Sequence, residues 1–195
     1  MDLQLLYLSY GISFLFLIIP FRQYQGYYFY YFCSISFSGV FSFLFYNCGI
    51  NQNIALLLFA NLALLSVHYE YLNKKNNFLI LLVYVIISFV VYFLSSYKIV
   101  FAYCILIRIL IVGFVVNRAL KFILTKQKLL GFHIAIILFE LLVAFKLFAY
   151  IIMLDSRFAI YNTINVAEGL LAVFFIIFSE DGFSLAIPVR FHNRN

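Results

Sequence analysis

The sequence has few charged residues and almost no proline. Of its 195 residues only 10% are charged, whereas 67% are hydrophobic, and the mean hydropathy is +1.09. A water-soluble domain carries about a quarter charged residues, so this composition excludes a soluble globular protein. Proline occurs only at positions 20 and 188, so the long apolar runs between them need no proline kinks.

The motifs of several chemical classes are also missing. Cys33, Cys48 and Cys104 are isolated and show no C-x-x-C spacing, which argues against a disulfide framework or a zinc site. There is no H-E-x-x-H, no nucleophile elbow, no glycine-rich phosphate loop and no aspartate cluster. His68 and His133 are expected to make ordinary hydrogen bonds near a membrane interface rather than to bind a metal. The sequence therefore predicts neither an enzyme nor a protein that holds a metal or other cofactor.

Seven apolar runs fill the chain, and each is long enough to cross the hydrocarbon core of a bilayer, which takes about 20 helical residues. The predicted spans are 3–19, 27–47, 53–72, 77–95, 98–118, 130–153 and 159–179. The first run is read as a retained span, because it lacks a basic start and a small-residue cleavage site. The predicted fold is an all-α membrane protein with a seven-transmembrane-helix bundle at 1–179 and a cytoplasmic tail at 180–195.

The basic residues outside the spans predict the orientation. With the N-terminus on one side of the membrane, that side holds only Lys98 and Arg157. The opposite side holds the nine others, which are Arg22, Lys74, Lys75, Arg118, Lys121, Lys126, Lys128, Arg190 and Arg194. The positive-inside rule then places the N-terminus outside and the C-terminus in the cytoplasm. We expect a bacterial inner membrane, with an organellar membrane as the alternative.

The net charge of +6 does not indicate nucleic acid, because the basic residues are spread over loops and form no tract for a phosphate backbone. The segment 118–128 places three lysines among apolar residues. We expect an ordinary cytoplasmic loop there, and the alternative is an interfacial extension of a neighbouring helix.

Four charged residues fall inside the predicted spans. They are Arg108 in the fifth, Glu140 and Lys146 in the sixth, and Glu168 in the seventh. An unpaired charge at the bilayer centre costs at least about 2.5–3.5 kcal/mol, so we expect these side chains to neutralise one another. The prediction is a subbundle of the last three helices, with Arg108 bridging Glu140 or Glu168. Glu140 and Lys146 point about 120° apart on one helix and should have different partners.

A stripe of small residues marks the second span. Ser34, Ser38 and Ser42 recur every four residues with Gly39 beside them, a pattern that lets another helix approach closely. The stripe predicts a helix-packing seam, which either another helix of this chain or a partner subunit would cover.

These features predict a non-catalytic accessory subunit of a larger membrane protein complex. Its partners would be membrane lipids, other integral membrane subunits and a cytoplasmic protein at the C-terminal tail, where 183–191 alternates in a way that favours an extended strand. The alternative is a small transporter or seven-helix sensor that uses Arg108, Glu140, Lys146 and Glu168 as an ion or ligand site. The charges are confined to the last three spans, so the first four are expected to face lipid or a partner.

Overall fold

The described chain is almost wholly helical. The computed structural model describes residues 3–68, 77–94, 96–152, 157–180 and 186–188. Its elements are α1 (Leu3–Arg22), α2 (Phe29–Asn47), α3 (Asn53–His68), α4 (Asn77–Leu94), α5 (Tyr97–Lys126), β1 (Lys128–Leu130), α6 (Gly131–Ile151), α7 (Arg157–Ile177) and β2 (Ala186–Pro188). The apolar runs of the sequence thus correspond to seven helices in the described residues. The predicted ends at 69–72, 95 and 153 lie outside them.

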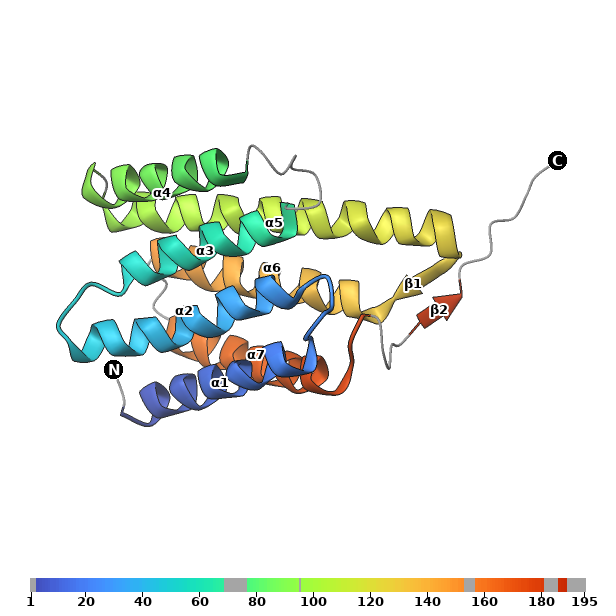
Figure 1. The fold of residues 1–195 in the computed structure, drawn as a ribbon. Helices are drawn as coiled ribbons and strands as arrows, with labels where there is room; N and C mark the ends of the chain where they lie inside the picture. The colour runs from blue at the N-terminus through green and yellow to red at the C-terminus, as the bar shows by residue number, and fades with distance from the viewer. Residues whose placement is uncertain (1–2, 69–76, 95, 153–156, 181–185, 189–195) are drawn as a thin grey trace.

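Six of the helices form a closed ring. Contacts join α1 to α2, α2 to α3, α3 to α5, α5 to α6, α6 to α7, and α7 back to α1. The remaining helix, α4, packs mainly on α3 and lies at the edge of the bundle (Figure 1). The three charged helices α5, α6 and α7 contact one another in sequence order, and α1, α2 and α3 close the ring with them.

The segment 118–128 is not a loop. The helix α5 continues through Arg118 to Lys126 and ends at Gln127, whose left-handed φ of 53° stops further helix. At 1.5 Å per residue, its 30 residues extend about 45 Å, well beyond a hydrocarbon core of about 30 Å. The segment thus extends the preceding helix, and its interfacial position stays a prediction. The end of α5 projects with β1 and β2 past the other helices (Figure 1).

The two short strands pair with each other. Lys128, Leu129 and Leu130 of β1 oppose Pro188, Ile187 and Ala186 of β2 in an antiparallel register. Backbone groups of an extended segment need hydrogen-bond partners, and here the segment after α5 supplies them to the C-terminal segment.

A hydrogen bond between α1 and α2 lies beside Pro20. The helix α1 does not end at this proline but continues to Arg22. Proline has no N–H to donate to the carbonyl four residues earlier, which is that of Phe16. The Ser36 hydroxyl of α2 lies 2.5 Å from this carbonyl oxygen and 2.7 Å from the Phe32 carbonyl of its own helix. A neighbouring helix therefore places a shared hydroxyl donor beside the carbonyl that Pro20 leaves without one.

A polar contact attaches α4 to the ring. The amide nitrogen of Asn61 on α3 donates to the Ser88 hydroxyl on α4 at 2.6 Å, and the Tyr103 hydroxyl of α5 donates to the Asn61 amide oxygen at 3.1 Å. Asn61 is buried. One amide side chain therefore bonds both helices that flank it.

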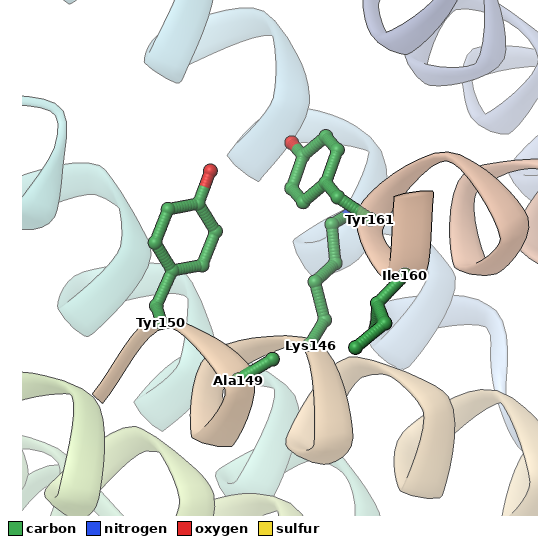
Figure 2. A pocket seen from close by; sticks show the side chains of 5 residues that line it. All are labelled: Lys146, Ala149, Tyr150, Ile160 and Tyr161. Atoms are coloured by element: carbon green, nitrogen blue, oxygen red, sulfur yellow. The ribbon is translucent and has the colours of Figure 1, made fainter. Parts of the chain in front are cut away.

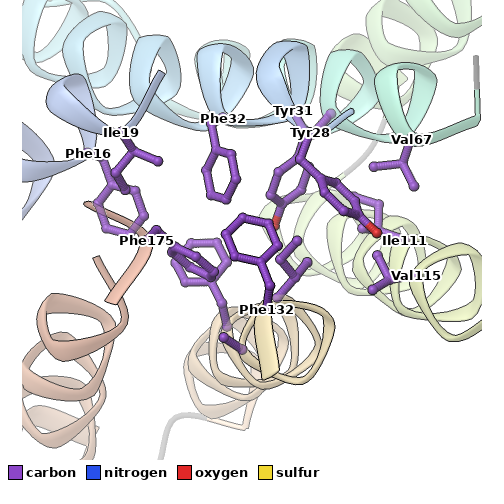
Figure 3. Close-up of a cluster of buried hydrophobic side chains, with 14 of the residues drawn as sticks. Phe16, Ile19, Tyr28, Tyr31, Phe32, Val67, Ile111, Val115, Phe132 and Phe175 are labelled. Atoms are coloured by element: carbon purple, nitrogen blue, oxygen red, sulfur yellow. The ribbon is translucent and has the colours of Figure 1, made fainter. Parts of the chain in front are cut away.

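Aromatic side chains fill the ring near one end. The rings of Phe32, Phe132 and Phe175 meet between α2, α6 and α7, with centroids 4.9–6.0 Å apart, and Tyr28 and Tyr31 join them from α2 (Figure 3). All five are at most 1% exposed. Tyr28, which directly precedes α2, and Tyr31 thus face the core.

Four helical segments are long and apolar enough to cross a membrane, judged by length and composition of the described residues. They are Phe29–Asn47, Tyr97–Lys126, Gly131–Ile151 and Ile160–Ile177. Asn53–His68 and Leu82–Phe93 are shorter apolar helices. The structure thus fits a helical membrane protein and leaves the seven-span count as a prediction.

Candidate functional site: a buried charge network beside a cavity

The first ion pair joins α5 to α6 inside the ring. The Nη1 of Arg108 donates to both carboxylate oxygens of Glu140, at 3.0 and 3.1 Å. The Tyr31 hydroxyl of α2 donates to Oε1 of the same carboxylate. Glu140 is fully buried, and Arg108 is 6% exposed. Three helices therefore converge on one carboxylate in an apolar interior.

The second ion pair joins α6 to α7. The Lys146 ammonium donates to Oε2 of Glu168 at 3.0 Å and to the amide oxygen of Asn165 at 2.6 Å. It also lies 4.3 Å from the centroid of the Tyr161 ring, a cation–π distance. Glu140 and Lys146, six residues apart on α6, therefore have different partners. Each of the two positive charges thus faces one negative charge.

A cavity of about 160 Å³ separates the two pairs. Arg108, Lys146 and Glu168 line it together with Ser38 and Gly39 of α2, and the remaining wall is apolar, from Ile12, Phe16, Ile35, Phe139 and Val143. Such a volume holds several water molecules or a small organic molecule. All helices of the ring except α3 contribute to this wall.

Two buried donor groups at the network lack an acceptor among the described residues. They are the Nε of Arg108 and the amide nitrogen of Asn165. Buried donors without a partner are rare in proteins and call for an explanation such as a water or a ligand.

A smaller pocket lies on the other side of Lys146. Its wall consists of Lys146, Ala149, Tyr150, Ile160 and Tyr161. Figure 2 shows the Tyr150 and Tyr161 rings on opposite sides of this space, with the lysine side chain between their helices. Lys146 therefore borders both cavities. The smaller one lies toward the end of the bundle where α6 ends and α7 begins.

A second cluster of charges lies at the opposite end of the bundle. The Glu180 carboxylate, just after α7, accepts from Nε of Arg118 on α5 at 2.9 Å and lies 3.2 Å from Nε2 of His133 on α6. The Arg118 guanidinium lies 3.3 Å from the centroid of the Tyr27 ring. Burial by itself raises the pKa of the Glu180 carboxyl, but the hydrogen bond to His133 and the charge of Arg118 outweigh it, so this pKa lies below its usual value.

The buried amide of Gln23 closes the same end. It donates at 2.8 Å to the carbonyl oxygen of Phe175 in the last turn of α7 and to that of Phe178 directly after the helix. The last carbonyls of a helix need such donors from outside it. The end of α1 is thereby joined to the end of α7.

The serines of the predicted seam have different environments. Ser34 is buried and bonds the Tyr30 carbonyl of its own helix, Ser38 lines the cavity, and Ser42 is half-buried. The hydroxyl that reaches another helix is that of Ser36, which the four-residue stripe leaves out.

Several residues of the network did not stand out in the sequence. Glu180 was not among the predicted site residues, but it is 7% exposed and belongs to the buried cluster with Arg118 and His133. Tyr31 gave no signal, because it lies within a run of tyrosines. His68 stacks on Phe114, and Glu70 lies outside the described residues.

The described residues contain no group of three or more His, Cys, Asp or Glu side chains placed to hold a metal ion. Comparison of the chain with protein-family models, with curated proteins and with solved structures finds no match.

Proposed function

We propose that this protein is a non-catalytic accessory subunit of a larger complex in the bacterial inner membrane, with seven spans, an outside N-terminus and a cytoplasmic C-terminus. The observed ends of the helices support this orientation. Arg22, Arg118, Lys121, Lys126 and Lys128 share one end of the bundle, whereas Lys98 and Arg157 lie at the other. This asymmetry of the described basic residues is the one that the positive-inside rule associates with a cytoplasmic face.

The observation that carries the subunit role is the projecting end of α5. Leu120 and Leu124 lie on one face of this helix and are 53% and 72% exposed, and the side chains of Lys121 and Lys126 are also exposed. This part of α5 extends beyond the length that a hydrocarbon core covers. An apolar face with a basic rim outside the membrane core is typical of a protein interaction surface. Its occupant is an acidic, partly apolar segment of a neighbouring subunit.

Gentle detergent extraction tests the role. The protein should be recovered in a stoichiometric complex, and replacing both Leu124 and Lys121 by Ser should release it. Leu110→Ser is the matched control, because Leu110 is 45% exposed on the membrane-spanning part of the same helix. Recovery of the wild-type chain as a lone monomer would contradict the proposal.

A small transporter or a sensor is the second candidate, and the cavity favours it. Ion pairs that only fix helix packing need no open space, yet Arg108, Lys146 and Glu168 all border one. Intramembrane charges beside a cavity are typical of ion and substrate pathways. In reconstituted vesicles Glu168→Gln should abolish uptake of the transported solute while the variant still inserts, with Ser42→Ala as the control.

A further inference from the structure

We infer that the cavity between the two ion pairs is a binding site for a small molecule that carries a carboxylate group, and that this carboxylate sits on the unoccupied edge of the Arg108 guanidinium. This inference rests on the second proposed function, that of a transporter or sensor, and names its ligand class. The site would take the ligand from the outer end of the bundle.

The guanidinium has two edges with different surroundings. Its Nη1 bonds both oxygens of Glu140. Among the described residues neither Nε nor Nη2 has an acceptor, and Nε is buried. These two nitrogens form a planar fork whose spacing matches the two oxygens of a carboxylate. Arg108 is 6% exposed and lines the cavity, and its Nε is shielded from solvent. A planar anion would therefore reach the guanidinium through this space at Nη2, and a small rotation of the side chain would bring Nε to its second oxygen.

The charges of the site limit what fits it. Arg108 with Glu140 and Lys146 with Glu168 make a network of zero net charge. A molecule that brings a carboxylate and an ammonium together adds no net charge to the apolar interior, which avoids a large desolvation penalty. Its ammonium would face Glu168, whose Oε1 has no partner among the described residues. A molecule with a carboxylate but no ammonium group would also bind Arg108, but it would bring one uncompensated negative charge into the site.

Aromatic side chains close the ring on one side of the site. On the cytoplasmic side Tyr28, Phe32, Phe132 and Phe175 fill the ring and are at most 1% exposed (Figure 3). On the outer side the cavity reaches Lys146, beyond which lies the small pocket beside Tyr150 and Tyr161 (Figure 2). A ligand would therefore enter from the outer end and stop at the level of Glu140.

The binding test uses the full-length purified protein in detergent and measures the thermal unfolding midpoint. Alanine and propionate are the two carboxylate probes, and propylamine is the control that lacks the carboxylate. At least one carboxylate should raise the midpoint, whereas propylamine should not. A larger shift with alanine assigns the ligand to zwitterions, and a larger shift with propionate assigns it to plain carboxylates. No shift with either, or an equal shift with propylamine, would overturn the inference.

Three variants test the assignment to this cavity. Arg108→Lys keeps a positive charge opposite Glu140 but removes the fork, so affinity should fall at least about tenfold. Ser38→Phe places a ring in the cavity, replaces none of the four charged residues, and should abolish the shift. Leu44→Phe adds a ring at an exposed position of the same helix and should retain it. Wild-type affinity in either Arg108→Lys or Ser38→Phe would show that the carboxylate binds elsewhere.

Thiol labelling tests the direction of entry. In a background with Cys33, Cys48 and Cys104 replaced by Ser, Ser38→Cys should react with a membrane-impermeant thiol reagent added outside, and the effective carboxylate probe should slow the reaction. Ala135→Cys in the sealed half should stay unreactive. Binding without any uptake or signalling would refute the transporter or sensor role but leave the site standing, so the two failures are distinguishable.

Discussion

At the scale of single residues, the burial of the Arg108–Glu140 pair dominates its energetics. Glu140 is fully buried and receives hydrogen bonds from Arg108 and from Tyr31. The attraction between buried charges is roughly offset by the loss of hydration, but the loss of one partner leaves a charge that nothing compensates. The pair therefore matters more for the choice of helix neighbours than for net stability.

Removal of one member of this pair should be more harmful than removal of both. Glu140→Leu should destabilise the protein by about 3–5 kcal/mol, and Arg108→Leu added to it should restore most of the loss. Glu168→Gln should cost less, because Lys146 keeps its contacts with Asn165 and Tyr161. Unfolding in mixed micelles measures these differences. Additive losses in the double variant would contradict the expected coupling.

The Glu180 cluster predicts a loss of stability in acid. The pKa of Glu180 is lowered in the folded protein, so its ionised form contributes stability above the ordinary glutamate value of 4.5, and this contribution disappears as the pH falls through the lowered value. The melting temperature should therefore drop below about pH 4.5.

A variant isolates this contribution. Glu180→Gln should be less stable than the wild type by about 1–3 kcal/mol at neutral pH and should lose less on acidification. The same melting curves, recorded for both proteins from pH 7 to pH 3, provide the measurement. Parallel pH profiles of the two proteins would show that Glu180 is not the responsible group.

At the scale of helices, one backbone carbonyl couples α1 to α2. It is that of Phe16, which lacks its helical N–H donor because residue 20 is a proline. Ser36→Ala should cost about 0.5–1.5 kcal/mol in the wild-type background, because the Phe16 carbonyl loses the donor that replaces the missing N–H. In a Pro20→Ala background the helix supplies its own donor, so the same substitution should cost clearly less. A double-mutant cycle on unfolding free energies measures the coupling, and an equal cost in both backgrounds would argue against it.

The attachment of α4 depends on Asn61. Interhelical hydrogen bonds inside membrane proteins contribute about 0.6 kcal/mol each on average, and Asn61 makes two, to Ser88 and Tyr103. Asn61→Leu should therefore loosen α4 while the six-helix ring persists. Proteolysis within 69–76 measures this change. It should become faster in Asn61→Leu than in the control Asn53→Leu, which lies at the start of the same helix.

The sequence was most informative about helices and least about their arrangement. Seven apolar runs locate the seven helices, because burial in lipid or in a bundle selects long apolar segments. The continuation of α5 past Arg118 was missed, because mixed lysines and leucines fit a loop as well as a helix. The contact between α1 and α7 that closes the ring has no local signature in the sequence, since it depends on which helix faces pack together.

The charge network shows the same limit. The four charges in apolar runs could be picked out from the sequence, because unpaired charges are energetically costly there. Tyr31 and Glu180 do not, because a tyrosine in an aromatic run and an acid after a helix both fit ordinary interface positions. Their roles depend on side chains brought together from different helices. The cavity also follows only from packing, since its lining residues come from five helices.

At the scale of the whole molecule, the closed ring explains how one small chain keeps a polar interior in an apolar setting. Charged and polar side chains point into the ring, and the outer surface carries exposed apolar residues on every helix from α4 to α7, such as Phe93, Leu106, Phe148 and Leu170. A bilayer satisfies such a surface, whereas water does not. The distribution of apolar surface thus agrees with the composition of the chain.

The orientation of this ring is the remaining global prediction. A reporter that is active only in the cytoplasm should be active at the C-terminus and inactive at the N-terminus, because the basic residues after α5 resist translocation. The same reporter should be inactive when it is fused after Asn47, which we place outside. It should be active when it is inserted within 69–76 or after Gln127, which we place in the cytoplasm. Substitution of Lys121, Lys126 and Lys128 by Gln should give a mixed population by removing three of the nine topogenic charges. If both termini report from the same compartment, the chain crosses an even number of times and one of the shorter helices, such as α3 or α4, does not span.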